Sequence, residues 1–232
     1  PDMRGSGWTD APADGYRKEQ MADEMSRFMK AVGAPRAKVM GHDMGGFVGF
    51  MLALRHPEQV DKYVAMDIIS PWLNAKMLPD MWRFAYQPVL AAPVLGAKLI
   101  QQPWFVRTML RAASPKADWS EADFDAFTGP LQNRARAEAG SKMYREVLRE
   151  IPQAISGAWD GSRLAAPTLL LLSEHDPAIR KHAAGDYQQF ADDMQVEIVP
   201  GAGHFLAEEQ PAFVAARALG FFGKRGTAAR AG

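Results

Sequence analysis

Gly41-His42-Asp43-Met44-Gly45-Gly46 is the stretch that decides the fold of this chain. It follows a short apolar run, Val39-Met40, and leads into a segment of helical character that extends to about His56. Glycine allows the backbone to turn sharply where a Cβ atom would clash. The helix start adds free N–H groups and the positive end of the helix dipole beside the carboxylate. The stretch therefore predicts that Asp43 is a nucleophile displayed at a strand-to-helix turn.

Asp43 also fits the ordinary role of aspartate as a helix N-cap, so its role as a nucleophile depends on partners elsewhere in the chain. Two polar groups follow later apolar runs. Asp176 ends the run that begins at 167, and His204 follows the run 195–199 in a turn of small residues. Alone, each has an ordinary structural explanation. Asp176 fits an Asx turn, and His204 fits a histidine whose hydrogen bonds are made with neighbouring residues. Together, they predict a nucleophile, an acid and a base in that chain order.

The pattern of apolar residues predicts strands that alternate with helices. The expected strands are 37–40, 60–68, 167–172 and 195–199, and the expected helices are 16–32, 44–56, about 179–190, and one from 211 onward. This alternation indicates an α/β fold with a parallel, doubly wound sheet. Ligands bind at the carboxyl ends of strands in such sheets, where the candidate residues fall.

Residues 70–164 differ in character from the rest of the chain. They contain tryptophans, prolines and amphipathic helical segments, and show no convincing strand. We expect this region to be a helical cap, or lid, inserted in the sheet domain. The predicted organisation is a first core segment at 1–69, the lid at 70–164 and a second core segment at 165–232.

Composition excludes several kinds of protein. The chain has 232 residues, a formal net charge of +0 and no cysteine. Balanced charge gives no reason to expect nucleic acid or an anionic membrane as a partner. The lack of cysteine rules out disulfides and thiol catalysis, and the histidines lack the spacing of zinc ligands. We expect a cytoplasmic globular enzyme without cofactor or metal, and the composition leaves its oligomeric state open.

These motifs together resemble the α/β-hydrolase superfamily, in the branch with an aspartate nucleophile that includes epoxide hydrolases and haloalkane dehalogenases. The resemblance covers essentially the whole chain. The matching stretches are the loop Pro1-Asp2-Met3-Arg4-Gly5-Ser6-Gly7, the elbow 41–46, the acid loop 173–177 and the histidine turn 201–205. The family's His-Gly-x-Pro loop and first strands would precede Pro1, so we expect that N-terminal strands are missing here.

Two lid tyrosines favour the epoxide hydrolases within this branch. Epoxide hydrolases resemble one another in a Phe-x-Tyr-Gln stretch and a later tyrosine before arginine, matched here by Phe84-Ala85-Tyr86-Gln87 and Met143-Tyr144-Arg145. An opening epoxide produces an alkoxide, which needs a proton. A tyrosine with a pKa near ~10 can supply it at neutral pH. The resemblance therefore implies that Tyr86 and Tyr144 hold and protonate the epoxide oxygen.

The predicted function is hydrolysis of a small hydrophobic epoxide by water, through an alkyl ester of Asp43. His204, oriented by Asp176, would activate the water, and the Met44 N–H would stabilise the oxyanion. Asp67 ends the strand 60–68 and is a second candidate for the acid.

Two other functions remain open from the sequence. The first is dehalogenation of a haloalkane or haloacid by the same covalent mechanism. Haloalkane dehalogenases usually carry a tryptophan directly after the nucleophile, where this chain has Met44, and fluoroacetate dehalogenases carry arginines, which 44–47 lack. The tryptophans Trp72, Trp82, Trp104 and Trp119 could donate to halide, although we expect them to pack the lid and line an apolar pocket. The second is a non-catalytic receptor of the same fold.

Overall fold

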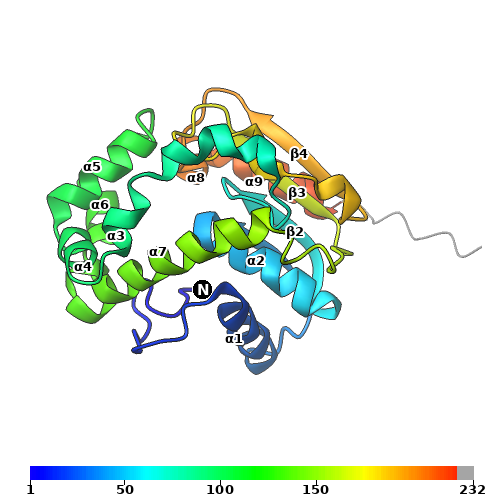
Figure 1. The fold of residues 1–232 in the computed structure, drawn as a ribbon, viewed down its shortest axis with the longest axis horizontal. Coiled ribbons are helices and arrows are strands. Elements are labelled where there is room, and N and C mark those ends of the chain that lie inside the picture. Colours follow the sequence, from blue (N-terminus) through cyan, green and yellow to red (C-terminus); the bar gives the residue numbers. More distant parts are fainter. Residues whose placement is uncertain (224–232) are drawn as a thin grey trace, which may run out of the picture.

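A four-stranded parallel sheet forms the centre of the molecule. The computed structural model describes residues 1–223 (Figure 1). The strands are β1 (Ala37–His42), β2 (Val60–Met66), β3 (Thr168–Ser173) and β4 (Met194–Val199), and they lie in the order β1-β2-β3-β4 with every neighbouring pair parallel. The predicted α/β class is confirmed.

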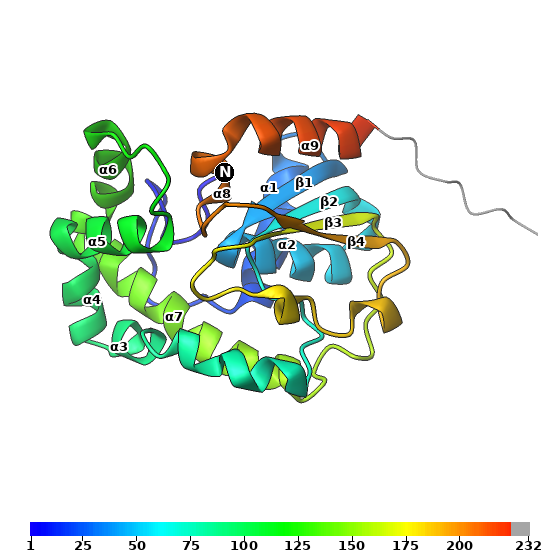
Figure 2. The same ribbon diagram turned by 90° about the horizontal axis from the view of Figure 1, so that it is seen from above.

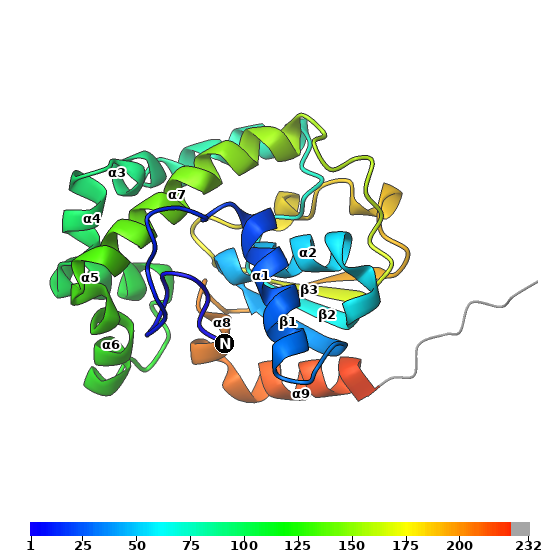
Figure 3. The ribbon, with the colours of Figure 1, turned by 90° about the horizontal axis from the view of Figure 1, so that it is seen from below.

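Helices cover both faces of this sheet, which is why its central strands contain the continuous apolar runs 63–66 in β2 and 169–172 in β3. Helices α1 (Lys18–Ala31) and α2 (Asp43–Arg55) lie on one face, and α9 (Pro211–Gly223) lies on the other (Figures 2 and 3). Successive strand residues point to opposite faces. Tyr63 accordingly packs in the cluster beneath α2, and Val64 in the cluster beneath α9.

The segment between β2 and β3 is helical, as predicted. Its elements are η2 (Ala75–Phe84), α3 (Gln87–Ala91), α4 (Leu95–Ile100), α5 (Pro103–Ala113), α6 (Glu121–Thr128), η3 (Pro130–Gln132) and α7 (Arg134–Ile155). No strand interrupts them in this described segment. Figure 1 shows α3 to α6 gathered to one side of the sheet, joined to it along the long helix α7.

Short elements complete the core, and one predicted helix is wrong. They are η1 (Pro57–Gln59), η4 (Lys181–Ala184), η5 (Tyr187–Gln189) and α8 (Leu206–Glu209). The predicted helix at about 179–190 is replaced by η4 and η5. Gly185 interrupts it with a φ of 58°, and a Cβ there would lie 1.9 Å from the carbonyl oxygen of Trp72. The next N–H donates to that same carbonyl at 2.8 Å, so a contact far away in sequence overrides local helical tendency.

The described residues 1–223 contain no helix that is long and apolar enough to cross a membrane. The predicted second core segment, 165–232, extends past this range, so its last part at 224–232 lies outside the described residues.

Candidate active site

The predicted nucleophile lies on a sharp turn between β1 and α2. Asp43 has a φ of 48°, a left-handed conformation that is costly for any residue except glycine. The neighbouring glycines are required because a side chain at either position would clash with nearby atoms. A Cβ on Gly41 would lie 2.6 Å from the carbonyl oxygen of Gly45, and one on Gly46 would lie 2.8 Å from Ile68. The turn leaves the Asp43 side chain 41% exposed, which makes it accessible to a substrate.

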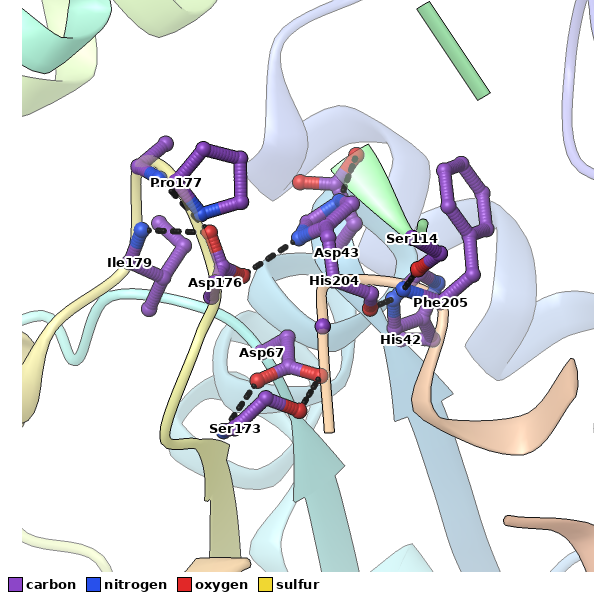
Figure 4. Close-up of polar contacts among 12 residues, drawn as sticks. His42, Asp43, Asp67, Ser114, Ser173, Asp176, Pro177, Ile179, His204 and Phe205 are labelled. Atoms are coloured by element: carbon purple, nitrogen blue, oxygen red, sulfur yellow. Dashed lines mark hydrogen bonds and ion pairs between the residues drawn. The ribbon is translucent and has the colours of Figure 1, made fainter. Parts of the chain in front are cut away.

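The structure brings the predicted acid and base together beside this turn (Figure 4). His204 Nδ1 lies 2.6 Å from Asp176 Oδ2, and Asp176 is completely buried. The other carboxylate oxygen of Asp176 accepts the N–H groups of Ala178 at 2.7 Å and Ile179 at 2.8 Å. These bonds fix the imidazole so that Nε2 faces Asp43, 4.0 Å from its Oδ2.

The charges around His204 favour its protonated form. Burial disfavours the imidazolium, but the hydrogen bond to Asp176 and the charges of Asp176 and Asp43 outweigh it and raise the pKa of His204 to about 9. At neutral pH the resting imidazole is therefore mainly protonated. The charge of Asp43 is part of the reason.

Asp67, the second candidate acid, has a different partner. It is fully buried and accepts the backbone N–H of Ser173 at 2.7 Å and the Ser173 hydroxyl at 2.8 Å. Burial, followed by the charge of Asp176, raises the pKa of Asp67 to about 8. The hydrogen bond to the His204 ring goes to Asp176, the candidate preferred from the sequence.

The two predicted tyrosines meet on the lid side of Asp43. Tyr86 and Tyr144 pack edge to face, with ring centroids 6.2 Å apart. Burial raises the pKa of both hydroxyls, and the charge of Asp43 adds to the effect. Both tyrosines therefore keep their protons at neutral pH and can donate them. With Asp43 and His204, they line two cavities.

The larger cavity is apolar and encloses about 480 Å³. Besides the catalytic candidates, its walls include Leu90, Ile100, Phe105, Met109, Leu131 and Phe205. The smaller cavity encloses about 30 Å³, and Met44 contributes to its wall. Met44 is the second residue of α2, where backbone N–H groups have no carbonyl acceptor within the helix. The Met44 N–H can therefore donate a hydrogen bond to a group bound in this cavity.

Two supports of the site were not predicted. His42 Nε2 lies 2.8 Å from the backbone carbonyl oxygen of His204, and burial followed by the His204 charge lowers the pKa of His42. At the end of α5, the Ala113 carbonyl accepts the His204 N–H at 2.9 Å, and the Ser114 hydroxyl accepts the N–H of Phe205 at 2.6 Å. The sequence could have indicated His42, because it lies directly before Asp43. It contains no pattern that predicts the contacts of Ala113 and Ser114 with the histidine turn.

The tryptophans fulfil only part of the expectation: Trp119 packs against Phe124 and Phe127 of the lid, but none in the described part of the chain lines the pocket. Trp82 and Trp104 are 68% and 62% exposed, and the indole N–H groups of Trp72 and Trp119 donate to backbone carbonyls at 3.1 Å. Within residues 1–223, no tryptophan lines either cavity beside Asp43, so the predicted lining role is wrong. No group of three or more acidic or histidine side chains in this range could hold a metal ion.

Sequence comparison connects this geometry to known proteins. The pattern of the family described as alpha/beta hydrolase fold matches residues 1–211. The soluble epoxide hydrolase of Corynebacterium sp. (strain C12) is 26% identical over 232 residues, covering 96% of this chain and 79% of the relative. Haloalkane dehalogenase 2 of Mycobacterium bovis is 24% identical, covering 96% and 77%.

Solved structures show the same arrangement. Cfl2 from Burkholderia cenocepacia superposes with a TM-score of 0.83 at 25% identity, covering 96% of this chain and 77% of Cfl2. The epoxide hydrolase CorEH superposes with a TM-score of 0.79 at 26% identity, covering 96% and 80%. The fold predicted from the sequence is therefore confirmed over both the sheet and the inserted helices.

Proposed function

This chain belongs to the α/β-hydrolase fold family, and on that basis we propose that it opens small hydrophobic epoxides to diols through an ester of Asp43. One observation carries the proposal: two tyrosines, Tyr86 and Tyr144, line the same cavities as Asp43 and His204. Relatives named epoxide hydrolases support it. The larger cavity supports an apolar substrate, because its walls are mainly aliphatic and aromatic.

In the first step, the Asp43 carboxylate attacks an epoxide carbon, and the ring C–O bond breaks. The ring oxygen becomes an alkoxide and takes a proton from Tyr86 or Tyr144. The result is a hydroxyalkyl ester of Asp43 and a tyrosinate. The raised pKa of each tyrosine means that the proton leaves only for a strong base such as this alkoxide.

In the second step, the imidazolium of His204 first gives its proton through solvent to the tyrosinate, which is the stronger base. The neutral imidazole then takes a proton from a water molecule, and the hydroxide adds to the carbonyl carbon of the ester. The Met44 N–H donates to the oxyanion. The acyl C–O bond then breaks, and the leaving alkoxide takes the proton held by His204. The remaining proton of the water passes from the Asp43 carboxyl to the imidazole, which restores the carboxylate and the imidazolium of the resting enzyme. The sum is epoxide plus water giving diol.

Ester formation itself prepares His204 for this second step. The resting imidazole has a pKa of about 9 and is a poor base at neutral pH. The ester has no charge at Asp43, so one of the charges that raise the pKa of His204 disappears. The neutral imidazole is then more populated at the step that requires it.

Trapping the ester tests the proposal. In the variant His204→Gln, ester formation should proceed and hydrolysis should stop. Incubation with styrene oxide should then raise the protein mass by the mass of that epoxide. The double variant His204→Gln/Asp43→Asn is the matched control, and it should stay unmodified. An adduct of equal yield in both proteins, or no adduct in either, would contradict the mechanism.

A dehalogenase would use the same nucleophile, acid and base, and one relative carries that name. It would also need donors that hold halide beside Asp43. In the described residues, no tryptophan lines the two cavities, whereas Tyr86 and Tyr144 line both. We favour epoxide opening for this reason. A receptor without catalysis would have no use for an imidazole held between two carboxylates.

A further inference from the structure

The smaller cavity contains polar groups that the proposed mechanism does not use. Lys18 comes from α1, Gln87 from α3 and Glu150 from α7, and all three line the cavity on whose wall Asp43 also lies. They belong to elements far apart in the sequence. A cluster of this kind in an otherwise apolar interior needs an explanation.

These side chains are buried and incompletely paired. Lys18, Gln87 and Glu150 are 0%, 4% and 5% exposed, and Lys18 Nζ lies 3.5 Å from Glu150 Oε1. The atoms Lys18 Nζ, Gln87 Oε1 and Glu150 Oε1 have no hydrogen-bond partner among residues 1–223. Burial raises the pKa of Glu150 to about 7, with the charge of Lys18 opposing the shift. A buried polar atom without a partner is costly, so the cavity is built for a polar occupant.

The unpaired atoms define the chemistry of that occupant. The ammonium of Lys18 is a donor, and the oxygens of Gln87 and Glu150 are acceptors. A hydroxyl group both accepts and donates, so it can pair with Lys18 and with one of the oxygens. A carboxylate would meet the like charge of Glu150, and an alkyl group would give none of these atoms a hydrogen bond. The cavity of about 30 Å³ admits a group about as small as water.

The two cavities adjoin the same reacting groups. Asp43, Tyr86, Tyr144 and His204 lie on the walls of both. An epoxide held at Asp43 would therefore direct one substituent into the large apolar cavity and the other into the small polar one.

We infer that Lys18, Gln87 and Glu150 form a subsite for a hydroxyl group, and that the preferred substrates are epoxy alcohols with a short hydroxyl-bearing arm and a longer apolar arm. This inference rests on the proposed function and refines its substrate class. The discrimination arises because an alkyl arm leaves these buried polar atoms without a hydrogen bond.

A matched pair of substrates tests the subsite. One is an epoxide with hydroxymethyl on one ring carbon and pentyl on the other, and the second has ethyl in place of hydroxymethyl. The wild-type protein should show a kcat/KM about tenfold or more higher for the hydroxymethyl compound, as expected for hydrogen bonds to charged groups. In Lys18→Met/Glu150→Leu this preference should vanish or reverse. Replacing both partners avoids leaving one buried charge alone.

Two further variants complete the experiment. Arg163→Met/Asp192→Leu removes an ion pair of 2.5 Å at the surface and should leave the preference unchanged. Gln87→Leu removes one neutral acceptor and should reduce the preference. If Lys18→Met/Glu150→Leu does not fold, Gln87→Leu alone tests the subsite. A wild-type protein that opens both epoxides equally, or a preference that survives in Lys18→Met/Glu150→Leu and in Gln87→Leu, would overturn the inference, and the cavity would then hold water only. If the wild type opens neither compound, the proposed function itself fails.

Discussion

Replacing Asp43 with asparagine should lower the pKa of His204. The two side chains face each other without a direct hydrogen bond, since His204 Nε2 and Asp43 Oδ2 are 4.0 Å apart. The negative charge of Asp43 is one of the causes that raise the pKa of His204 to about 9. Asparagine has nearly the same shape as aspartate and no charge, so it imitates the electrostatic state of the ester intermediate.

The expected size of the change follows from the distance. At 4.0 Å, two unit charges interact by about 1 kcal/mol in a water-like dielectric and by about 4 kcal/mol at the effective dielectric of ~20 near a protein surface. One pK unit corresponds to about 1.4 kcal/mol, so these limits span about 1 to 3 units. Because the Asp43 side chain is 41% exposed, solvent screens it, and we expect about 1 to 2 units. The pKa of His204 should then lie at about 7 to 8.

Proton NMR of the imidazole Cε1–H during a pH titration measures this shift. The chain has five histidines, and His204→Gln identifies the signal of interest by its disappearance. Asp23→Asn is a matched control. Asp23 bonds His56 Nε2 at 2.7 Å in another part of the molecule, so its loss should leave the titration of His204 unchanged.

An unchanged or higher pKa of His204 in Asp43→Asn would refute the reasoning. It would mean that the Asp43 charge does not reach the imidazole and that ester formation does not release the base. A lower pKa in Asp23→Asn as well would show that the effect is general rather than local.

Other variants test separate parts of the site. Tyr86→Phe and Tyr144→Phe should each slow ester formation about 10²-fold in single-turnover mass spectrometry, and the double variant should slow it further, with the fold unchanged by circular dichroism. Asp67→Asn should keep turnover within about tenfold, because burial already raises the pKa of that carboxyl to about 8, whereas Asp176→Asn should cost about 10³–10⁴ in kcat. Equal losses in these two variants would contradict the assignment of the acid. Ser114→Ala should lower the unfolding free energy by about 1 kcal/mol in urea titrations, because the partly buried N–H of Phe205 loses its acceptor.

The fold could be predicted where local pattern and tertiary structure agree. Strands covered on both faces contain continuous apolar runs, and residues 63–66 of β2 and 169–172 of β3 show this directly in the sequence. The segment 179–190 failed because its conformation depends on Trp72, whose carbonyl oxygen leaves no room for a side chain at Gly185. Such a contact joins residues more than a hundred positions apart and leaves no periodic signal.

The sequence was sufficient to predict which strand ends carry the site residues, but not how their side chains pair. Asp43, Asp176 and His204 follow strands whose carboxyl ends meet at one edge, so topology alone predicts that they lie near one another. Topology does not choose between Asp67 and Asp176, because each follows a strand of the same sheet. The choice depends on side-chain direction: one carboxylate accepts from the imidazole, and the other accepts from a neighbouring serine.

The contacts of the lid with the histidine turn have a consequence for catalysis. Two hydrogen bonds join the end of α5 to the backbone of residues 204 and 205, one to the Ala113 carbonyl and one to the Ser114 hydroxyl. The same insertion supplies Tyr86 and Tyr144. Under the proposed mechanism, a lid that moved away from the sheet as one body would displace the two proton donors and remove two backbone supports of the histidine turn in a single motion. Under the proposed mechanism, the position of the lid would couple the two half-reactions, because the donors of the first step and the backbone supports of the second step belong to one inserted segment.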